Sequence, residues 1–410
     1  MPLGFLDEVM RRFASTIDST SLEAIMTNIN SLSVGPNGAS ISIKNRINRN
    51  IFERNKVDEL SNKIEKIEEF QKIREIYRFF ITSSVTSMES RYIAEAVLYS
   101  NFINGSPIYE ILRAQIKFLC GEPRDISFIM FLSGISVGSD IFINDDISLR
   151  NLRNISEIKS DDMAAFQFSG IHLNNFSALH FRFKSKMEPE IGNGCCDLKL
   201  STPKEYMDEI LRACFASGLP VQEVGRAIVL PPDLRGLGSP VFEKPALAPV
   251  FYEECAMDDQ KGFASTARKY LALDDGRRAK LRIPLERLNA AAREVSSLDK
   301  SIDLGIALES LLFEKEEKNS IGDKISIKYA NILKNCGFDE IESKNKMNEF
   351  YEVRSKAVHL GSWDILRKSR SYEPEERVEY ARFVTTKLIG QKIDQAYEEA
   401  TSSASGSSSL

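Results

Sequence analysis

Histidine, tryptophan and cysteine are scarce in this chain. Its 410 residues include three histidines, one tryptophan and six cysteines. The cysteines are scattered, and the only close pair, Cys195 and Cys196, is adjacent in the sequence, which favours neither a disulfide framework nor a thiolate metal site. No histidine lies at metal-ligand spacing from a cysteine or another histidine. We therefore expect no metal, no cofactor and a reducing, cytoplasmic setting.

Long apolar runs are also missing. No stretch approaches the roughly 18 apolar residues that a transmembrane helix needs. The first residues, 1–13, include Asp7, Glu8, Arg11 and Arg12 among their apolar positions, which interrupts the hydrophobic core that a signal peptide requires. We expect no membrane partner.

The chain has no excess of positive charge. Its net charge is −5 and its sequence pI is near 5.6, so any contact with nucleic acid must come from a local basic patch. Glycine-rich phosphate loops and dinucleotide fingerprints are absent as well, and Gly192-Asn-Gly194 is too short to be one. These absences exclude the common nucleotide-binding enzymes, but they leave nucleic-acid chemistry open.

The length and the apolar content, 42% of residues, support more than one hydrophobic core. The texture of the sequence predicts an α+β chain in three sections and a tail. Residues 1–125 read as mainly helical, 126–290 as strand-rich with a Pro/Gly-rich connector at 230–249, and 291–400 as an all-helical module. The serine-rich end, 401–410, has too little apolar surface to fold.

Local patterns predict individual elements in the first two sections. Apolar residues spaced three and four apart between Val57 and Phe80 predict one long amphipathic packing helix. A second helix is predicted after Ser106 as the cap and Pro107 as the first helical residue, ending at Gly121. In the middle section, alternating apolar residues predict strands on both sides of a turn at 144–146, another strand at 179–184 with residue 180 exposed, and a helix from the capping box at 202–205 to residue 218.

The last section is predicted to contain helices with defined ends. Leu304 and Leu308 lie on the apolar stripe of a helix over 298–314. Pro374, surrounded by glutamates, suits the first turn of a later helix, since negative charge there meets the positive end of the helix dipole. Between them, one segment has apolar residues on the stripe of a further helix: Met347, Phe350, Tyr351, Ala357 and Val358.

Arg354 occupies a position on that stripe where an apolar residue is normally found. We therefore expect its guanidinium to face a core or an interface, where it must be paired or hydrogen-bonded. Periodicity leaves two interpretations open: a structural ion pair, or a charge held for an anionic ligand. Glu309, inside the preceding apolar helix, is one candidate partner, but it can equally be a surface glutamate paired with any lysine.

His359 follows near the helix end that Gly361 predicts. Five residues turn an ideal helix by about 140°, so the two side chains do not stack, although a long arginine near a helix end can reach around. A histidine there meets the negative end of the dipole, which in most proteins is simply a favourable cap. The basic residues close to it in the sequence are Lys356, Arg367, Lys368 and Arg370.

The string Arg354-Ser-Lys-Ala-Val-His359 resembles the R-x4-6-H motif of HEPN domains. Two further segments are similar to the Apea-like branch of that family: the helix at 303–312, with its Ala-Leu-Glu sequence, and the context at 350–361. The resemblance covers about a quarter of the chain. It implies a C-terminal HEPN-like helical bundle that forms a homodimer, so that two motifs face each other in a composite cleft.

The resemblance also implies an activity, metal-independent cleavage of single-stranded RNA through attack by the ribose 2′-hydroxyl. In this chain His359 would transfer protons and Arg354 would bind the phosphate. Lys356 would assist binding, and Ser355 or Tyr351 would orient the phosphate or the histidine. If Glu309 pairs with Arg354, it would orient the arginine. Family resemblance further suggests bacterial defence or a growth-arrest toxin, with an inhibitory or sensing protein partner.

One departure from the family pattern supports a different function. Many HEPN ribonucleases have asparagine, aspartate or histidine directly after the motif arginine, whereas this chain has Ser355. A serine forms hydrogen bonds but cannot share proton transfer as a histidine can. The alternative is therefore a noncatalytic HEPN module for dimerisation and for binding a nucleotide, RNA or a protein.

Overall fold

The computed structural model describes residues 54–66, 70, 77–81, 84–87, 89–155, 177–192, 195–201, 204–237, 241–243, 255–257, 259–312, 327, 334 and 338–406. Packing divides the chain into two compact units, which are described separately. The first comprises Met1–Phe131, Leu152–Pro203 and Gly225–Ala246, and the second comprises Leu132–Asn151, Lys204–Val224 and Leu247–Leu410.

Three α-helices of the first unit have described bounds. They are α3 (Arg54–Glu65), α5 (Ser90–Asn104) and α6 (Ile108–Leu119). α5 packs against α3, against α6 and against the short 3-10 helix η4 (Arg235–Leu237). The predicted second helix is confirmed as α6, but Pro107 is its N-cap residue and not its first helical residue. Gly121, with φ of 88°, follows its end as expected.

The predicted long helix from Val57 to Phe80 is wrong at its end, residues 77–80, whereas Phe70 is helical and residues 67–69 and 71–76 lie outside the described part of the chain. The structure ends α3 at Glu65, and Tyr77–Ile81 forms strand β1. Four of the five residues of β1 are aromatic or β-branched. Such residues favour a strand when neighbouring strands are available for pairing. β1 pairs in parallel with β9 (Cys195–Leu200) and antiparallel with β2 (Ser84–Ser87). With β8 (Met187–Gly192) they form a four-stranded sheet in the order β2-β1-β9-β8.

A second sheet has six strands in the order β11-β10-β3-β7-β6-β5. The bounds are β3 (Arg124–Ser133), β5 (Ile141–Phe142), β6 (Ile147–Asn151), β7 (Ser177–Ser185), β10 (Gln222–Val229) and β11 (Val241–Glu243). The prediction that His180 lies on an exposed face is wrong, because its residue exposure is 4%. β7 is an interior strand, and the first part of an interior strand can be covered on both faces.

The predicted turn between two strands is confirmed, although the start of the second strand is buried on both faces. β5 and β6 pair antiparallel, and the Asn144 side chain accepts hydrogen bonds from the backbone N–H groups of Asp146 (3.0 Å) and Ile147 (2.8 Å). Side chains of this type favour turns because they replace a backbone acceptor locally. Nearby, β4 (Ile135–Ser136) pairs in parallel with β12 (Cys255–Ala256), and η2 (Leu152–Asn154) follows β6.

The connector predicted at 230–249 is only partly described. Where it is described it contains η4 and β11, so it is less irregular than its prolines suggest. Gly236 lies so close to α5 that an added Cβ would overlap the backbone of Ala96. Its N–H donates to the Ser100 hydroxyl, 2.9 Å away, which binds this stretch to α5.

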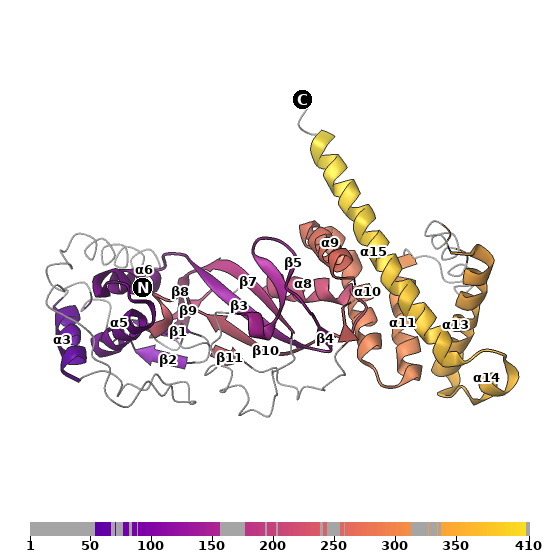
Figure 1. Ribbon diagram of the computed structural model, residues 1–410, viewed down its shortest axis with the longest axis horizontal. Coiled ribbons are helices and arrows are strands. Elements are labelled where there is room, and N and C mark those ends of the chain that lie inside the picture. Colours follow the sequence, from indigo (N-terminus) through magenta and orange to yellow (C-terminus); the bar gives the residue numbers. More distant parts are fainter. Residues whose placement is uncertain are drawn as a thin grey trace. The chain divides into compact units, whose positions relative to one another are not determined.

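The second unit is mainly helical. The helices with described bounds are α8 (Lys204–Phe215), α9 (Gln260–Ala272), α10 (Asp275–Arg293), α11 (Ser297–Leu312), α13 (Glu340–Leu360), α14 (Asp364–Ser369) and α15 (Pro374–Gly406). Figure 1 shows α15 as a long helix, and it packs against α9, α10, α11 and α13. Fully buried apolar side chains fill the space between these helices, among them Leu285, Leu304, Phe350, Val353 and Leu388.

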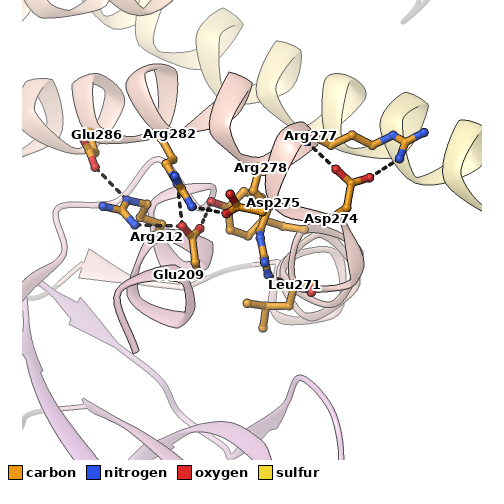
Figure 2. Close-up of polar contacts among 10 residues, drawn as sticks. Glu209, Arg212, Leu271, Asp274, Asp275, Arg277, Arg278, Arg282 and Glu286 are labelled. Carbon is orange, nitrogen blue, oxygen red and sulfur yellow. Dashed lines mark hydrogen bonds and ion pairs between the residues drawn. The ribbon is translucent and has the colours of Figure 1, made fainter. Parts of the chain in front are cut away.

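A buried carboxylate joins α8 to α9 and α10. Glu209, with 3% residue exposure, accepts hydrogen bonds from Arg212 Nη1 (3.1 Å), Arg282 Nε (2.7 Å) and the Tyr270 hydroxyl. Figure 2 shows Glu209 with Arg282 of α10 above it and Arg212 beside it. A buried carboxylate is costly unless its oxygens are paired in this way, so the cluster fixes how α8 packs on the other helices.

The predicted helix starts and stops of the last section largely hold. α11 carries buried Leu304 and Leu308, and α15 begins at Pro374 with Glu375 and Glu376 in its first turn. The prediction that 401–410 is an unfolded tail differs from the structure, because α15 continues to Gly406. Extending an existing helix adds one hydrogen bond for each residue that becomes ordered, so propagation can continue through polar residues. Three parts of the predictions lie outside the described residues: the first half of the capping box (202–203), the loop at 315–319 and the end of the tail (407–410).

The chain is thus mixed, with a sheet in its middle section and helices at its C-terminal end, as the α+β prediction states. Across the residues with described positions, no helix has both the length and the apolarity needed to cross a membrane.

Candidate functional site

Helix α13 carries the predicted motif and has well-defined ends. Asp339 caps its start by accepting a hydrogen bond from the N–H of Glu342, at 2.7 Å. Gly361 ends it with φ of 61°, a left-handed conformation that suits glycine, and its N–H donates to the Ala357 carbonyl at 3.1 Å. Buried Trp363 then folds back and donates from Nε1 to the Val353 carbonyl, at 3.1 Å. The last turn of α13 is therefore held in place.

Arg354 faces the neighbouring helix α11, as its position on the stripe predicts. Its Nη2 lies 3.1 Å from Oε1 of Glu309 and 3.4 Å from Oε2. The side chains are 26% and 27% exposed, so the pair is half-buried and remains open to solvent. Of the two interpretations left open by the sequence, the structure shows the ion pair, and it shows that the paired guanidinium is not sealed inside the unit.

Two donors on this face of α13 have no acceptor among the described residues. They are the Nε–H of Arg354 and the hydroxyl of Tyr351, both of which are buried atoms. Burial raises the pKa of Tyr351, and the nearby charge of Glu309 raises it further. Tyr351 is therefore a neutral hydrogen-bond donor at ordinary pH. Buried polar groups normally have partners, so these two donors are exceptions to that rule. Because both atoms are buried, a ligand would have to be bound by the part of the guanidinium that is open to solvent.

The other motif residues lie toward the open side of α13. His359 and Ser355 are exposed, and Lys356 is half-buried. Within the described part of the chain, no hydrogen bond or ion pair joins His359 to Arg354. Val358, assigned by periodicity to the apolar stripe, is 50% exposed, and Leu360 is 52% exposed. The stripe ends before them because Ala357 is the last buried position of the helix.

Acidic partners reduce the positive charge predicted around the motif. Arg367 forms an ion pair with Glu375, and Arg370 Nη2 lies 2.7 Å from Oε1 of Glu352 on α13. Lys368 is exposed on α14. Lys356 and Lys368 are therefore better placed than these arginines to contribute charge to a ligand site.

Glu352 is a residue that sequence reasoning missed. It accepts from Arg370 and, at 3.0 Å, from the Tyr372 hydroxyl, so it holds the segment around α14 against α13. Burial raises the pKa of Glu352, but the hydrogen bonds from Arg370 and Tyr372 outweigh burial, and the net pKa lies below the ordinary value of 4.5. Burial, together with the hydrogen bond to Glu352, raises the pKa of Tyr372 to about 12.

The arrangement supplies a half-exposed cation paired with α11, an exposed imidazole about 1.4 turns further along α13, and one neutral buried donor, the Tyr351 hydroxyl. Among the described residues, no group of three or more histidine, cysteine, aspartate or glutamate side chains is arranged to hold a metal ion. Comparison with known proteins found no matching family model, no matching curated protein and no matching solved structure. The likeness to Apea-like HEPN domains therefore rests on the sequence segments at 303–312 and 350–361 alone.

Proposed function

We propose that the protein is a metal-independent endoribonuclease of the HEPN type, which cuts single-stranded RNA by attack of a ribose 2′-hydroxyl. The observation that supports this proposal most is the half-exposed guanidinium of Arg354, which is paired with Glu309 of α11. Arg354 lies on α13, the helix that carries His359 in its last turn. A guanidinium that binds a phosphate must be open to solvent. This one keeps 26% of its side chain exposed.

The chemistry that we propose needs three groups. A base accepts the proton of the 2′-hydroxyl as its oxygen bonds to phosphorus, and an acid protonates the 5′-oxygen as the P–O5′ bond breaks. A fixed cation stabilises the negative charge that develops on the phosphorane. The products are a 2′,3′-cyclic phosphate and a 5′-hydroxyl.

In this proposal two copies of the chain pair through their HEPN-like helices. His359 from one copy accepts the proton, and His359 from the other donates one. Arg354 binds the phosphate, Lys356 adds affinity, and Tyr351 and Ser355 orient the phosphate or the imidazole. The biological role that we propose is bacterial defence or growth arrest, with a sensing or inhibitory protein partner.

The test is expression of matched variants in cells followed by measurement of total RNA integrity. Wild type should degrade RNA, while Arg354→Ala and His359→Ala should leave it intact. Lys344→Ala is the matched control, because Lys344 is an exposed charge at the other end of α13. If His359→Ala degrades RNA as fast as wild type, the proposal is wrong.

A second candidate function is a noncatalytic module for dimerisation and for binding a nucleotide, RNA or a protein. The ion pair between Arg354 and Glu309 favours it, because the arginine already has a partner, and so does Ser355 in place of a proton-transferring residue. Under this alternative, wild type and His359→Ala bind the same RNA oligonucleotide equally and neither slows growth when overproduced. Growth inhibition that His359→Ala abolishes would eliminate the alternative.

A further inference from the structure

Gly305 lies in the interior of helix α11, where glycine is a poor choice. Glycine at such a position destabilises a helix relative to alanine. Its φ is not in the left-handed region, so the backbone does not require glycine there. The residue is buried, and leucine, isoleucine and alanine surround it in the sequence. The reason for a glycine must therefore be the space that a side chain would fill.

That space is occupied by the stem of Arg354. A Cβ added to Gly305 would lie 2.7 Å from Arg354 Cδ and 3.2 Å from Cγ, and it would come closer still to Nε. These atoms are in the middle of the side chain, so the arginine could not avoid the methyl group by moving its tip alone. Its side chain would have to adopt another rotamer.

Gly305 and Glu309 are one turn apart on α11 and so lie on the same face of it. The first lets the Arg354 stem lie against the helix backbone, which buries Nε. The second accepts from Nη2 at the far end. A guanidinium has five N–H donors in a rigid plane, so contact at both places fixes its orientation while leaving donors for a ligand.

We infer that Gly305 is a positioning residue: it seats the Arg354 side chain across α11 so that the guanidinium is held ready for a phosphodiester. The catalytic half of this inference rests on the proposed ribonuclease function. The structural half, that the missing side chain of Gly305 accommodates Arg354, stands independently of it.

The structural half is tested by a double-mutant cycle on thermal stability. Gly305→Ala should lower the Tm of the wild type, because the methyl displaces the arginine. In the Arg354→Ala background the same change should raise the Tm, since the stem is gone and alanine favours a helix over glycine. Gly390→Ala on α15 is the control, because an added Cβ there meets nothing within 4 Å, and it should raise the Tm in both backgrounds. Equal effects of Gly305→Ala in both backgrounds would overturn the inference and leave the proposed function untouched.

The catalytic half is tested by RNA cleavage with the same proteins. Gly305→Ala should lower kcat by about 100-fold, as expected when a charged group is displaced by about 1 Å, with a smaller change in KM. Its pH profile should keep the shape of the wild type, because the proton-transferring imidazoles are unchanged. Gly390→Ala should cleave as the wild type does. Wild-type cleavage by a folded Gly305→Ala protein would refute the inference. If the Tm values follow the expected cycle but the protein never cleaves RNA, the proposed ribonuclease function is wrong. The structural half of the inference, that Gly305 accommodates the Arg354 side chain, would still hold.

Discussion

The guanidinium of Arg354 on α13 lies 3.1 Å from the carboxylate of Glu309 on α11, and both side chains are about one quarter exposed. A pair in this position can stabilise the helix packing, orient the arginine for a ligand, or do both. Exposed and half-exposed ion pairs contribute about 0 to 1 kcal/mol to stability, so packing alone gives Glu309 only a small role. Mutation of Glu309 can separate the two roles, because loss of packing changes stability whereas loss of orientation changes RNA cleavage.

We predict that Glu309→Gln lowers RNA cleavage by about 10-fold or more, because an unfixed guanidinium spends less time in the reactive position. The free energy of unfolding should change by about 1 kcal/mol or less, as measured by urea denaturation. Glu342→Gln on α13 is the control, since Glu342 forms a similar pair with Lys346 away from the motif. A rise in cleavage on Glu309→Gln would instead mean that the pair holds the arginine in an inactive state.

The buried cluster around Glu209 should matter for stability and not for chemistry. Tyr270→Phe removes one of three donors to this carboxylate, and an unsatisfied buried acceptor costs about 1 to 3 kcal/mol. The control is Glu286→Gln, because Glu286 is a 49% exposed partner of Arg212 and its loss should cost about 1 kcal/mol or less. Chemical denaturation measures both. Unfolding curves for Tyr270→Phe that coincide with those of the wild type would show that the cluster does not hold α8 in place.

Contacts of Glu352 predict an acid-dependent loss of stability. The pKa of Glu352 is lower in the folded protein than its ordinary value of 4.5, so its contribution is present above pH 4.5 and is lost as the pH falls through the folded pKa. At pH 7 the wild type should therefore be more stable than Glu352→Gln, and the difference should shrink in acid. Denaturation at a series of pH values measures the difference. A gap that stays constant down to pH 2 would contradict the assignment.

Helix α13 illustrates what a sequence can predict. Its apolar stripe as far as Ala357, the position of Arg354 on the stripe and the stop at Gly361 follow from local spacing, and the structure has each of them, whereas Val358 is exposed. Local spacing does not predict the structure of a segment when pairing with a strand far away in the sequence determines it. Tyr77–Ile81 fits a helical pattern, but it pairs with β9, more than 100 residues later in the chain. His180 was misplaced because alternation along a strand does not tell whether its second face is also covered, and the structure leaves only 4% of this residue exposed.

The candidate site was predicted only in part, for a similar physical reason. The sequence left two roles open for Glu309, as the partner of Arg354 or as a surface residue paired with a lysine. It could not decide between them because it does not show which face of α11 meets α13. Gly305 was missed, although a glycine inside an otherwise apolar helix was a visible signal, because its meaning depends on which side chain crosses it. The approach of Arg354 to His359, which the motif implies, stays a prediction that involves a second copy of the chain.

The central claim, metal-independent RNA cleavage, is tested most directly by incubating the purified full-length protein with single-stranded RNA in excess EDTA and identifying the product ends. The account predicts fragments with 2′,3′-cyclic phosphate and 5′-hydroxyl ends, formed by the wild type and not by His359→Ala. RNA that stays intact, or fragments that carry 5′-phosphate ends, would contradict it.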